Sequence, residues 1–222
     1  RSITKEKIIR KGAEANLYYG HWFGKEAIFK HRIPKKYRID ELDRIIRMVR
    51  TLNEARALIK VKKYGINVPQ VFELDSLNST IIMKYIEGKK LKNALAGLDD
   101  KKKQDYFKII GRYIAILHKN GHIHGDITTS NLIVTEREEI FLIDFGLHDY
   151  SDSIEDKSVD LHLLKRVLIS SHGEDFNLCF TAFIEGYQKE YSGNSLHECY
   201  AIIENISAIE SRGRYIKKEE RV

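Results

Sequence analysis

Three polar residues placed around two short apolar runs constrain this chain more than any other feature. Asp126 and Asn131 precede the apolar run Leu132–Val134. Asp144 follows a second apolar run, Ile140–Ile143. Short apolar runs separated by a polar turn are typical of buried strands. The pattern therefore predicts two strands that carry a carboxylate and an amide before them and a second carboxylate after them.

A carboxylate, an amide five residues later and a second carboxylate after a buried strand form the phosphoryl-transfer arrangement of protein kinases. In that arrangement Asp144 and Asn131 each hold a Mg²⁺ ion, and Asp126 orients the attacking hydroxyl group or water. Asp144-Phe145-Gly146 alone is a common turn, and an isolated His-x-Asp carries little information. Their joint presence at kinase spacing makes coincidence a poor explanation.

Two upstream residues have the positions expected of a nucleotide site. Lys30 ends a predicted strand, Glu26–Lys30, from which its ammonium group can reach the α- and β-phosphates of ATP. Glu54 lies on a predicted helix over Glu41–Lys63 and is the expected ion-pair partner of Lys30. The alternative is that Lys30 belongs to a solvated basic run and Glu54 to the polar face of the helix.

The rest of the expected nucleotide site is less specific. Gly12 and Ala13 begin a loop whose backbone amides can approach phosphates, but kinases usually have three glycines there, and Glu14 adds a negative charge. Met83 is expected at the back of an adenine pocket, with Ile86 at the hinge beyond it. An ordinary core methionine explains Met83 equally well.

Three histidines lie close together before Asp126. His118, His122 and His124 could bind zinc, but no cysteine or further acidic pattern completes a set of four ligands. We interpret His124 instead as a brace for the loop that carries Asp126.

The order of elements predicts an α+β chain with a minimal bilobal protein-kinase-like fold. A small strand-rich N-lobe with one long helix is expected over residues 1–86, and a reduced, mainly helical C-lobe over residues 87–211. A mobile basic C-terminal tail is expected over residues 212–222. The expected strands are Ala15–Tyr19, Glu26–Lys30, Gln70–Leu74 and Thr80–Ile86, and the later helices are Gln104–Lys119, Ser158–Ser171, Glu174–Tyr191 and Ser195–Ser211.

Composition narrows the class of protein. The 222 residues include 42% hydrophobic residues and only 2 prolines, which excludes a disordered or low-complexity chain. Cys179 and Cys199 are far apart and predict buried free thiols rather than a disulfide framework. No apolar run is long enough for a membrane span, and Arg1–Lys7 has no signal-peptide character, so a cytoplasmic location is expected. The first residue is not Met, which a processed terminus or excision from a longer polypeptide would explain.

Several motifs together resemble one family of small kinases. They are Gly12–Ala15, Lys30–Arg38, Glu54–Arg56, His124–Asn131 and, near the C-terminus, Arg212–Arg214. Spread over essentially the whole chain, they resemble the archaeal-type atypical kinase/ATPase subunit of the KEOPS tRNA-modification complex.

That resemblance implies a Mg²⁺-ATP-dependent atypical serine/threonine kinase and ATPase. It implies partnership with the metal-dependent tRNA threonylcarbamoyltransferase and other KEOPS subunits, which form threonylcarbamoyladenosine in tRNA, and contact with tRNA directly or through the complex. No membrane is implied. In some archaeal members the kinase is fused behind the transferase, which would account for a first residue other than Met.

The sequence departs from ordinary protein kinases in ways that suit this family. Gly125 stands where an arginine usually precedes the catalytic aspartate, and Thr128 stands where serine/threonine kinases place a lysine. The short segment after Gly146 contains no Ala-Pro-Glu motif that would help to build a peptide-docking platform. These features favour water as the phosphate acceptor, or ATP-driven motion relayed to a partner. Lys84 replaces an acidic hinge residue expected from the family pattern.

Other functions and the basic clusters remain open at this stage. A stand-alone RIO-like protein kinase, an aminoglycoside-type phosphotransferase and a nucleotide-stabilised binding module are the alternatives, and the retention of four catalytic-type residues argues against the last. The basic cluster Lys30–Arg38 and the tail could contact tRNA phosphates or an acidic partner, or could form a solvated face, and the tail could also fold back toward the ATP site. The tail cations are Arg212, Arg214, Lys217, Lys218 and Arg221.

Overall fold

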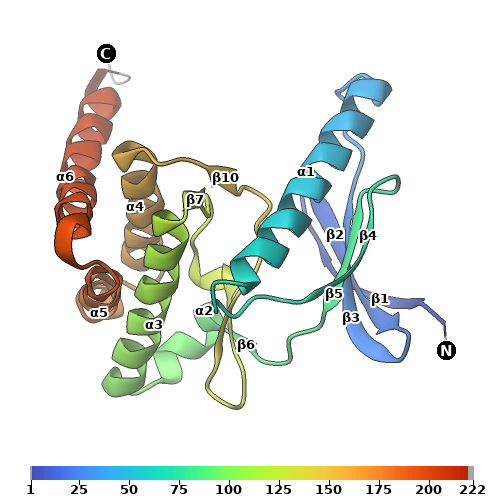
Figure 1. The fold of residues 1–222 in the computed structure, drawn as a ribbon, viewed down its shortest axis with the longest axis horizontal. Coiled ribbons are helices and arrows are strands. Elements are labelled where there is room, and N and C mark those ends of the chain that lie inside the picture. Colours follow the sequence, from blue (N-terminus) through green and yellow to red (C-terminus); the bar gives the residue numbers. More distant parts are fainter. Residues whose placement is uncertain (1, 220–222) are drawn as a thin grey trace. The chain divides into compact units, whose positions relative to one another are not determined.

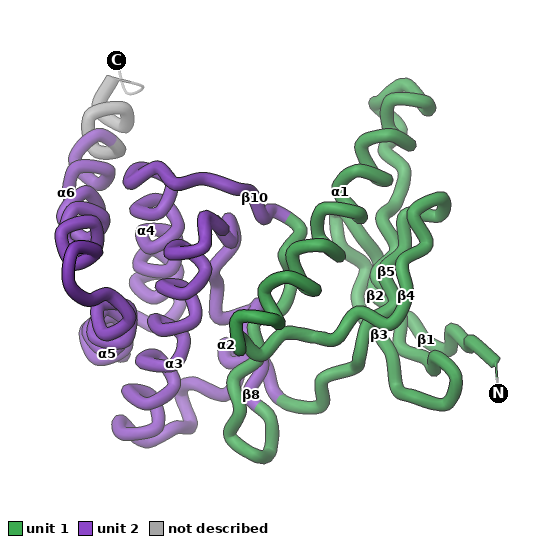
Figure 2. The backbone as a smooth tube through the Cα atoms, in the orientation of Figure 1, with its two compact units in different colours: residues 1–88, 135–146 green, residues 89–134, 147–222 purple. Residues whose placement is uncertain are grey.

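The computed structural model describes the backbone of residues 2–219 and the side chains of residues 2–212 (Figure 1). The chain forms two compact units (Figure 2). Unit 1 consists of residues 1–88 and 135–146, and unit 2 of residues 89–134 and 147–222. Unit 1 therefore takes in residues 135–146, which lie outside the stretch 1–86 predicted from the sequence.

Unit 1 is built on a five-stranded antiparallel sheet with the order β1-β2-β3-β5-β4. Its strands are β1 (Thr4–Lys11), β2 (Ala15–Trp22), β3 (Lys25–Arg32), β4 (Val71–Asp75) and β5 (Thr80–Lys84). The register places Lys30 on β3 between Leu17 and Ile81, well inside the sheet. The sequence analysis missed β1 because all eight of its residues are exposed, so it has no alternation of apolar and polar positions.

The long helix α1 (Asp40–Lys62) matches its predicted range closely. Gly65 follows it with φ +79°, as expected of a residue just beyond a helix C-terminus. The predicted apolar face was Leu42, Ile45, Ile46, Val49, Leu52, Ala55 and Leu58.

The first half of that predicted face is wrong. Ala55 and Leu58 are buried, but Leu42, Ile45 and Val49 are 51%, 44% and 43% exposed. Asp43 takes the buried position instead. Its carboxylate accepts hydrogen bonds from Arg47 Nε at 2.6 Å and from the Lys35 backbone N–H at 3.2 Å. Local hydrogen bonding to the Asp43 carboxylate therefore overrides the apolar pattern in this part of the helix.

The last part of unit 1 returns to it from later in the chain. The short strand β9 (Ile140–Leu142) lies here, and the Leu142 N–H donates to the Asn67 carbonyl oxygen at 2.9 Å. Asp144 follows this strand directly, so the predicted second carboxylate belongs to unit 1.

Unit 2 is mainly helical. Its α-helices are α2 (Leu91–Ala94), α3 (Asp100–Lys119), α4 (Ile154–Ser171), α5 (Phe176–Lys189) and α6 (Leu196–Glu219). Its short strands are β6 (Lys89–Lys90), β7 (His122–Ile123), β8 (Leu132–Val134) and β10 (Asp149–Tyr150). Single 3₁₀ turns cover η1 (Leu95–Gly97), η2 (Thr129–Asn131), η3 (Gly173–Asp175) and η4 (Gly193–Ser195).

Most helices of unit 2 agree with their predicted ranges. The predicted apolar face of α3, which is Phe107, Ile110, Ile114 and Leu117, is completely buried. Cys179 and Cys199 are free and buried, as predicted. No helix in the described part of the chain combines the length and apolar character needed to cross a bilayer.

The helix α6 continues to Glu219, past its expected end at Ser211. Residues 212–219 lack apolar periodicity, but most of them are good helix formers, so the helix does not stop where the apolar pattern does. The side chain of Arg212 donates to both carboxylate oxygens of Glu155, at 3.0 and 3.1 Å. The side chains of the other predicted tail cations, Arg214, Lys217, Lys218 and Arg221, lie outside the described residues.

The helices α3 and α5 lie side by side and approach closely at two glycines (Figure 1). A Cβ atom on Gly111 would lie 2.0 Å from the Phe183 carbonyl oxygen, and one on Gly186 would lie 2.1 Å from the Lys108 carbonyl oxygen. Because both clashes are with backbone, a side chain at either position would force the helices apart.

We expect Gly111→Ala to lower the free energy of unfolding by about 2 kcal/mol or more, because the added methyl group cannot be accommodated by side-chain movement. Chemical denaturation followed by circular dichroism measures this change. Gly97→Ala is the control, because a Cβ at Gly97 would meet no atom within 4 Å. Equal stability of the two variants would contradict the close approach of α3 and α5.

Candidate functional site

Lys30 is a buried cation held by two carboxylates. Its side chain is 8% exposed, and its Nζ donates to Glu54 Oε1 and to Asp144 Oδ1, each at 2.6 Å. The ion pair between Lys30 and Glu54 expected from the sequence is therefore present. Burial alone would lower the pKa of Lys30, but the charges of Glu54 and Asp144 outweigh it and raise that pKa above its usual value. The ammonium group thus stays charged.

Glu54 binds a second cation, which the sequence analysis did not single out. Glu54 is 1% exposed, and its Oε2 accepts a hydrogen bond at 2.6 Å from Nη2 of Arg32, itself 3% exposed. Lys30, Arg32, Glu54 and Asp144 form a network that we call the charge cluster. Two cations and two carboxylates balance within it, as buried charges require.

Asp144 has a backbone conformation that few residues adopt. Its φ is +67°, in the left-handed region, and its Oδ1 also accepts the Gly146 N–H at 3.1 Å. A Cβ on Gly146 would lie 3.0 Å from that same oxygen. Strain of this kind concentrates at functional sites, so the geometry favours a functional role for the Asp144 carboxylate.

The loop at Gly12 and Ala13 is closed by a hydrogen bond from the Gly12 N–H to the Ala15 carbonyl oxygen at 3.0 Å. A Cβ on Gly12 would lie 2.7 Å from that oxygen, so glycine is required there. The Glu14 carboxylate pairs with Arg50 at 3.0 Å and with Lys35 at 3.7 Å. Its charge, which counted against a phosphate loop, is therefore matched by cations.

Met83 and Ile86 are buried, at 8% and 7% exposure. The strand β5 places Met83 opposite Ile28 of β3 and Val71 of β4. An adenine-facing residue and a core residue would both be buried in this way. The adenine-pocket role of both residues therefore stays a prediction.

Asp126 and Asn131 lie together in unit 2. Asn131 Nδ2 donates to Asp126 Oδ2 at 2.8 Å and to the Asp126 carbonyl oxygen at 3.0 Å. With its amide nitrogen held in this way, Asn131 has its amide oxygen left to bind a cation. The two residues are brought together as the kinase pattern requires.

Asp160 of α4 fixes the loop that carries Asp126, and the sequence analysis missed it. Its fully buried carboxylate accepts the His124 and Gly125 N–H groups, each at 2.8 Å, and contacts His118 Nε2 at 3.1 Å. Burial alone would raise the pKa of Asp160, but the interactions with His118 and His124 outweigh it and lower that pKa. The sequence held one signal for this role, an aspartate next to Leu161 on the apolar side of a predicted helix.

The histidines serve the fold of unit 2. His124 Nδ1 accepts the Asp126 N–H at 3.2 Å, which agrees with its interpretation as a brace. His118 Nδ1 is 2.8 Å from the Tyr187 hydroxyl, and His122 Nδ1 is 2.8 Å from His148 Nε2. Within the described residues, no three His, Cys, Asp or Glu side chains form a metal-binding group.

Gly125 has a steric reason to replace the arginine of ordinary kinases. Its φ is +79°, and a Cβ there would lie 2.4 Å from the Leu147 carbonyl oxygen. Only glycine meets both conditions without strain.

These residues fit a nucleotide with Mg²⁺. Magnesium prefers oxygen ligands and is usually held by one or two carboxylates together with phosphates and water, so it needs no larger protein cage. Asp144 and Asn131 offer such oxygens, and Lys30 offers the cation for phosphate. Each unit thus holds part of the predicted set.

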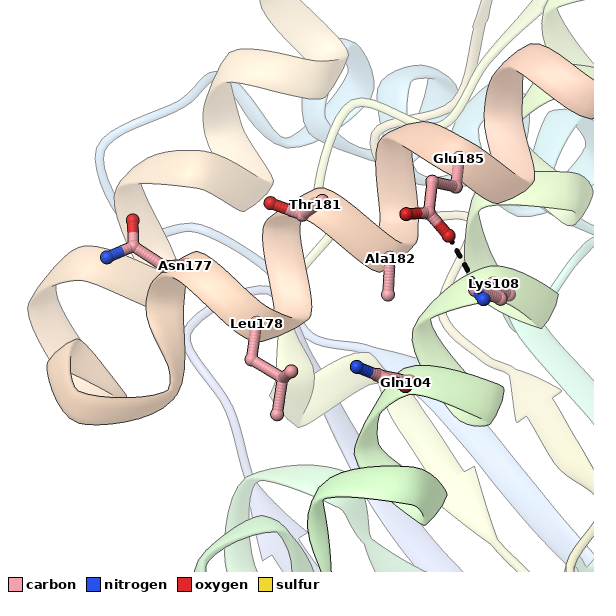
Figure 3. A pocket seen from close by; sticks show the side chains of 7 residues that line it. All are labelled: Gln104, Lys108, Asn177, Leu178, Thr181, Ala182 and Glu185. Atoms are coloured by element: carbon pink, nitrogen blue, oxygen red, sulfur yellow. Dashed lines mark ion pairs between the residues drawn. The ribbon is translucent and has the colours of Figure 1, made fainter.

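A groove of about 370 Å³ lies between α3 and α5 of unit 2. Its lining consists of Gln104, Lys108, Asn177, Leu178, Thr181, Ala182 and Glu185, with an ion pair between Lys108 and Glu185 at 3.0 Å (Figure 3). None of the predicted site residues lines it.

Comparison with known proteins agrees with this geometry. The RIO domain family matches residues 27–155. "KEOPS complex subunit Bud32" of Pyrococcus abyssi is 42% identical, over 94% of this chain and 96% of that protein. A "Probable bifunctional tRNA threonylcarbamoyladenosine biosynthesis protein" of Methanococcus maripaludis is 40% identical over 96% of this chain. One of the same name from Methanobrevibacter smithii is 43% identical over 95% of this chain.

The fold and the family match define a protein of the atypical kinase class, and the predicted α+β kinase-like fold is confirmed. The chain belongs to the RIO-domain family and, within it, to the family of KEOPS complex subunit Bud32. It spans about 37% of the length of the bifunctional relatives.

One pH dependence follows from the contact between His122 and His148. Burial and the nearby His122 and His124 lower the pKa of His148 to about 4, whereas a histidine in the unfolded chain titrates near 6.5. Between these values the unfolded chain binds a proton that the folded chain does not. The contribution of His148 to stability is therefore complete above about pH 6.5 and is lost as the pH falls toward about 4.

We expect the melting temperature to fall over that pH range, and to fall less steeply in His148→Gln, because the substituted chain has no proton to take up at this position. Scanning calorimetry at several pH values measures the slope. His197→Gln, at an exposed histidine of α6, should keep the wild-type slope. The assignment fails if His148→Gln also keeps it.

Proposed function

We propose that this chain is a Mg²⁺-ATP-dependent ATPase and atypical serine/threonine kinase that works as the Bud32 subunit of a KEOPS assembly. The observation that carries the proposal is the buried Lys30, which is held by Glu54 and Asp144 at 2.6 Å each. A cation placed between a helix carboxylate and the aspartate of an Asp-Phe-Gly motif is the arrangement by which kinases handle ATP phosphates.

Each site residue then has a defined task. Lys30 binds the α- and β-phosphates, and Glu54 orients it. Asp144 and the amide oxygen of Asn131 hold Mg²⁺, which neutralises charge on the phosphates when it is bound. The Asp126 carboxylate accepts a hydrogen bond from the attacking hydroxyl group or water and so orients it.

The remaining predicted residues complete the nucleotide site. The backbone at Gly12 and Ala13 approaches the phosphates, and Met83 and Ile86 border the adenine base. The closed turn at Gly12 supports the first of these roles. The second rests on the position of Met83 and Ile86 in the kinase pattern.

Water is the acceptor that the chain favours. The glycine at position 125 leaves no arginine to bind a phosphorylated activation segment, and Thr128 leaves no lysine beside Asp126 for a protein hydroxyl. The proposed working reaction is therefore ATP hydrolysis, with transfer to serine or threonine as a secondary activity.

The partners follow from the relatives. The names of the bifunctional relatives place this type of chain in proteins of threonylcarbamoyladenosine biosynthesis. We propose that the chain acts with the metal-dependent tRNA threonylcarbamoyltransferase, other KEOPS subunits and tRNA, in the cytoplasm. Much of the basic cluster after Lys30 is paired internally, for example Arg38 with Asp43 at 3.5 Å, which argues against Arg32 and Arg38 as tRNA contacts.

We expect Asp144→Asn to reduce Mg²⁺-dependent ATP turnover by about 100-fold or more, because it removes the charge that holds the metal. A time course with γ-labelled ATP measures free phosphate and labelled protein, with and without tRNA and the transferase. Free phosphate should dominate and should increase when both are added. Asp105→Asn, an exposed carboxylate of α3, should leave turnover unchanged.

Two results would contradict the proposal. Wild-type turnover by Asp144→Asn would remove Asp144 from the site. Label found mainly on added proteins, without a response to tRNA, would favour a stand-alone RIO-like protein kinase.

A further inference from the structure

Arg32 is a buried cation for which the proposed reaction has no assigned task. Its side chain is 3% exposed, and Nη2 donates to Glu54 Oε2 at 2.6 Å. Its Nε is buried without a hydrogen-bond partner among the described residues. Burial of a guanidinium group is costly, and a partly satisfied one is more so. The position therefore needs an explanation beyond packing.

Arg32 and Lys30 border the same small space. They are two residues apart on β3, so both side chains project from one face of the sheet. The position of a Cβ on Gly146 would be 3.4 Å from Arg32 Nη2 and 3.5 Å from Lys30 Nζ. Both cations thus lie beside the turn that carries Asp144.

The carboxylate oxygens of Glu54 are divided between these cations. Oε1 accepts from Lys30 and Oε2 from Arg32, each at 2.6 Å. If Lys30 were the sole partner, both oxygens of this carboxylate, which is 1% exposed, would turn to its ammonium group. A buried carboxylate needs compensation at both oxygens, so Lys30 would be drawn out of its position between Glu54 and Asp144.

We propose that Arg32 is a positioning residue that binds one oxygen of Glu54, so that Glu54 uses the other to hold Lys30 in the position from which it binds the phosphates of a nucleoside triphosphate. This inference rests on the proposed function for the identity of the ligand. Arg32 acts through Glu54 and does not touch the nucleotide.

Nucleotide affinity tests the proposal directly. In Arg32→Met the dissociation constant for a fluorescent ATP analogue with Mg²⁺ should rise about tenfold or more, because Lys30 becomes the only partner of Glu54. Arg32→Lys, which keeps the charge, should recover most of the affinity. Arg38→Met is the matched control in the same unit, since Arg38 pairs with Asp43 and not with the charge cluster. Thermal melting confirms that each variant is folded.

A second measurement uses no nucleotide. The rate at which trinitrobenzenesulfonate modifies Lys30, followed by mass spectrometry of its peptide, reports how firmly the amine is held. Arg32→Met should slow this modification several-fold, because the undivided charge of Glu54 holds Lys30 more tightly and keeps it protonated. Arg32→Lys and Arg38→Met should react at rates close to wild type.

The pathway of the effect is tested in a Glu54→Gln background. If Arg32 acts through Glu54, adding Arg32→Met there should change nucleotide affinity little. The same loss in both backgrounds would show that Arg32 contacts phosphate directly and would overturn the proposal. So would wild-type affinity and Lys30 reactivity in Arg32→Met. Failure of the wild-type chain to bind ATP would refute the proposed function, while the modification rates would still decide the role of Arg32.

Discussion

Unit 1 depends on the pairing of its buried charge cluster. The cluster draws residues from β3, α1 and the segment after β9, which are far apart in the sequence. Because a buried charge without its partner is strongly unfavourable, none of these segments can move away alone without a large cost in free energy. The same cluster holds the cation to which we assign phosphate binding and the carboxylate to which we assign metal binding. The stability of unit 1 and the proposed chemistry therefore depend on the same side chains.

Unit 2 fixes its part of the predicted site in a different way. A single buried carboxylate, that of Asp160, accepts backbone N–H groups from two consecutive residues of the loop that carries Asp126. Backbone donors fix the path of the loop regardless of its side chains, which allows glycine at position 125. The clash that a Cβ there would make with Leu147 shows that this glycine belongs to the packing of the loop. The backbone geometry of this loop therefore accounts for the glycine that stands in place of the arginine.

The geometry of the two units and the comparisons with known proteins point to the same kind of protein. Phosphoryl transfer demands positioned charges and little else from a protein, and both units supply them. The similarity to Bud32 covers nearly the whole chain, whereas the bifunctional relatives are much longer. The chain is similar to part of larger proteins of threonylcarbamoyladenosine biosynthesis. A proposed phosphate-binding centre in such a chain agrees with the proposed role of a subunit that hydrolyses ATP in support of a partner.

The sequence by itself determined the features that depend on residues close together in the chain. The spacing of Asp126, Asn131 and Asp144 led to the proposed chemistry, and the periodicity of α3 predicted its buried face. The roles of Arg32 and Asp160 could not be read from the sequence, because their partners lie 22 and 35 or more residues away. The first half of α1 was misread although the partners of Asp43 are near it in the sequence, since hydrogen bonds from Arg47 and Lys35 made Asp43 the buried residue in place of Leu42. Only the tertiary structure decided these positions, because the cost of burying a charge depends on which groups the fold brings beside it.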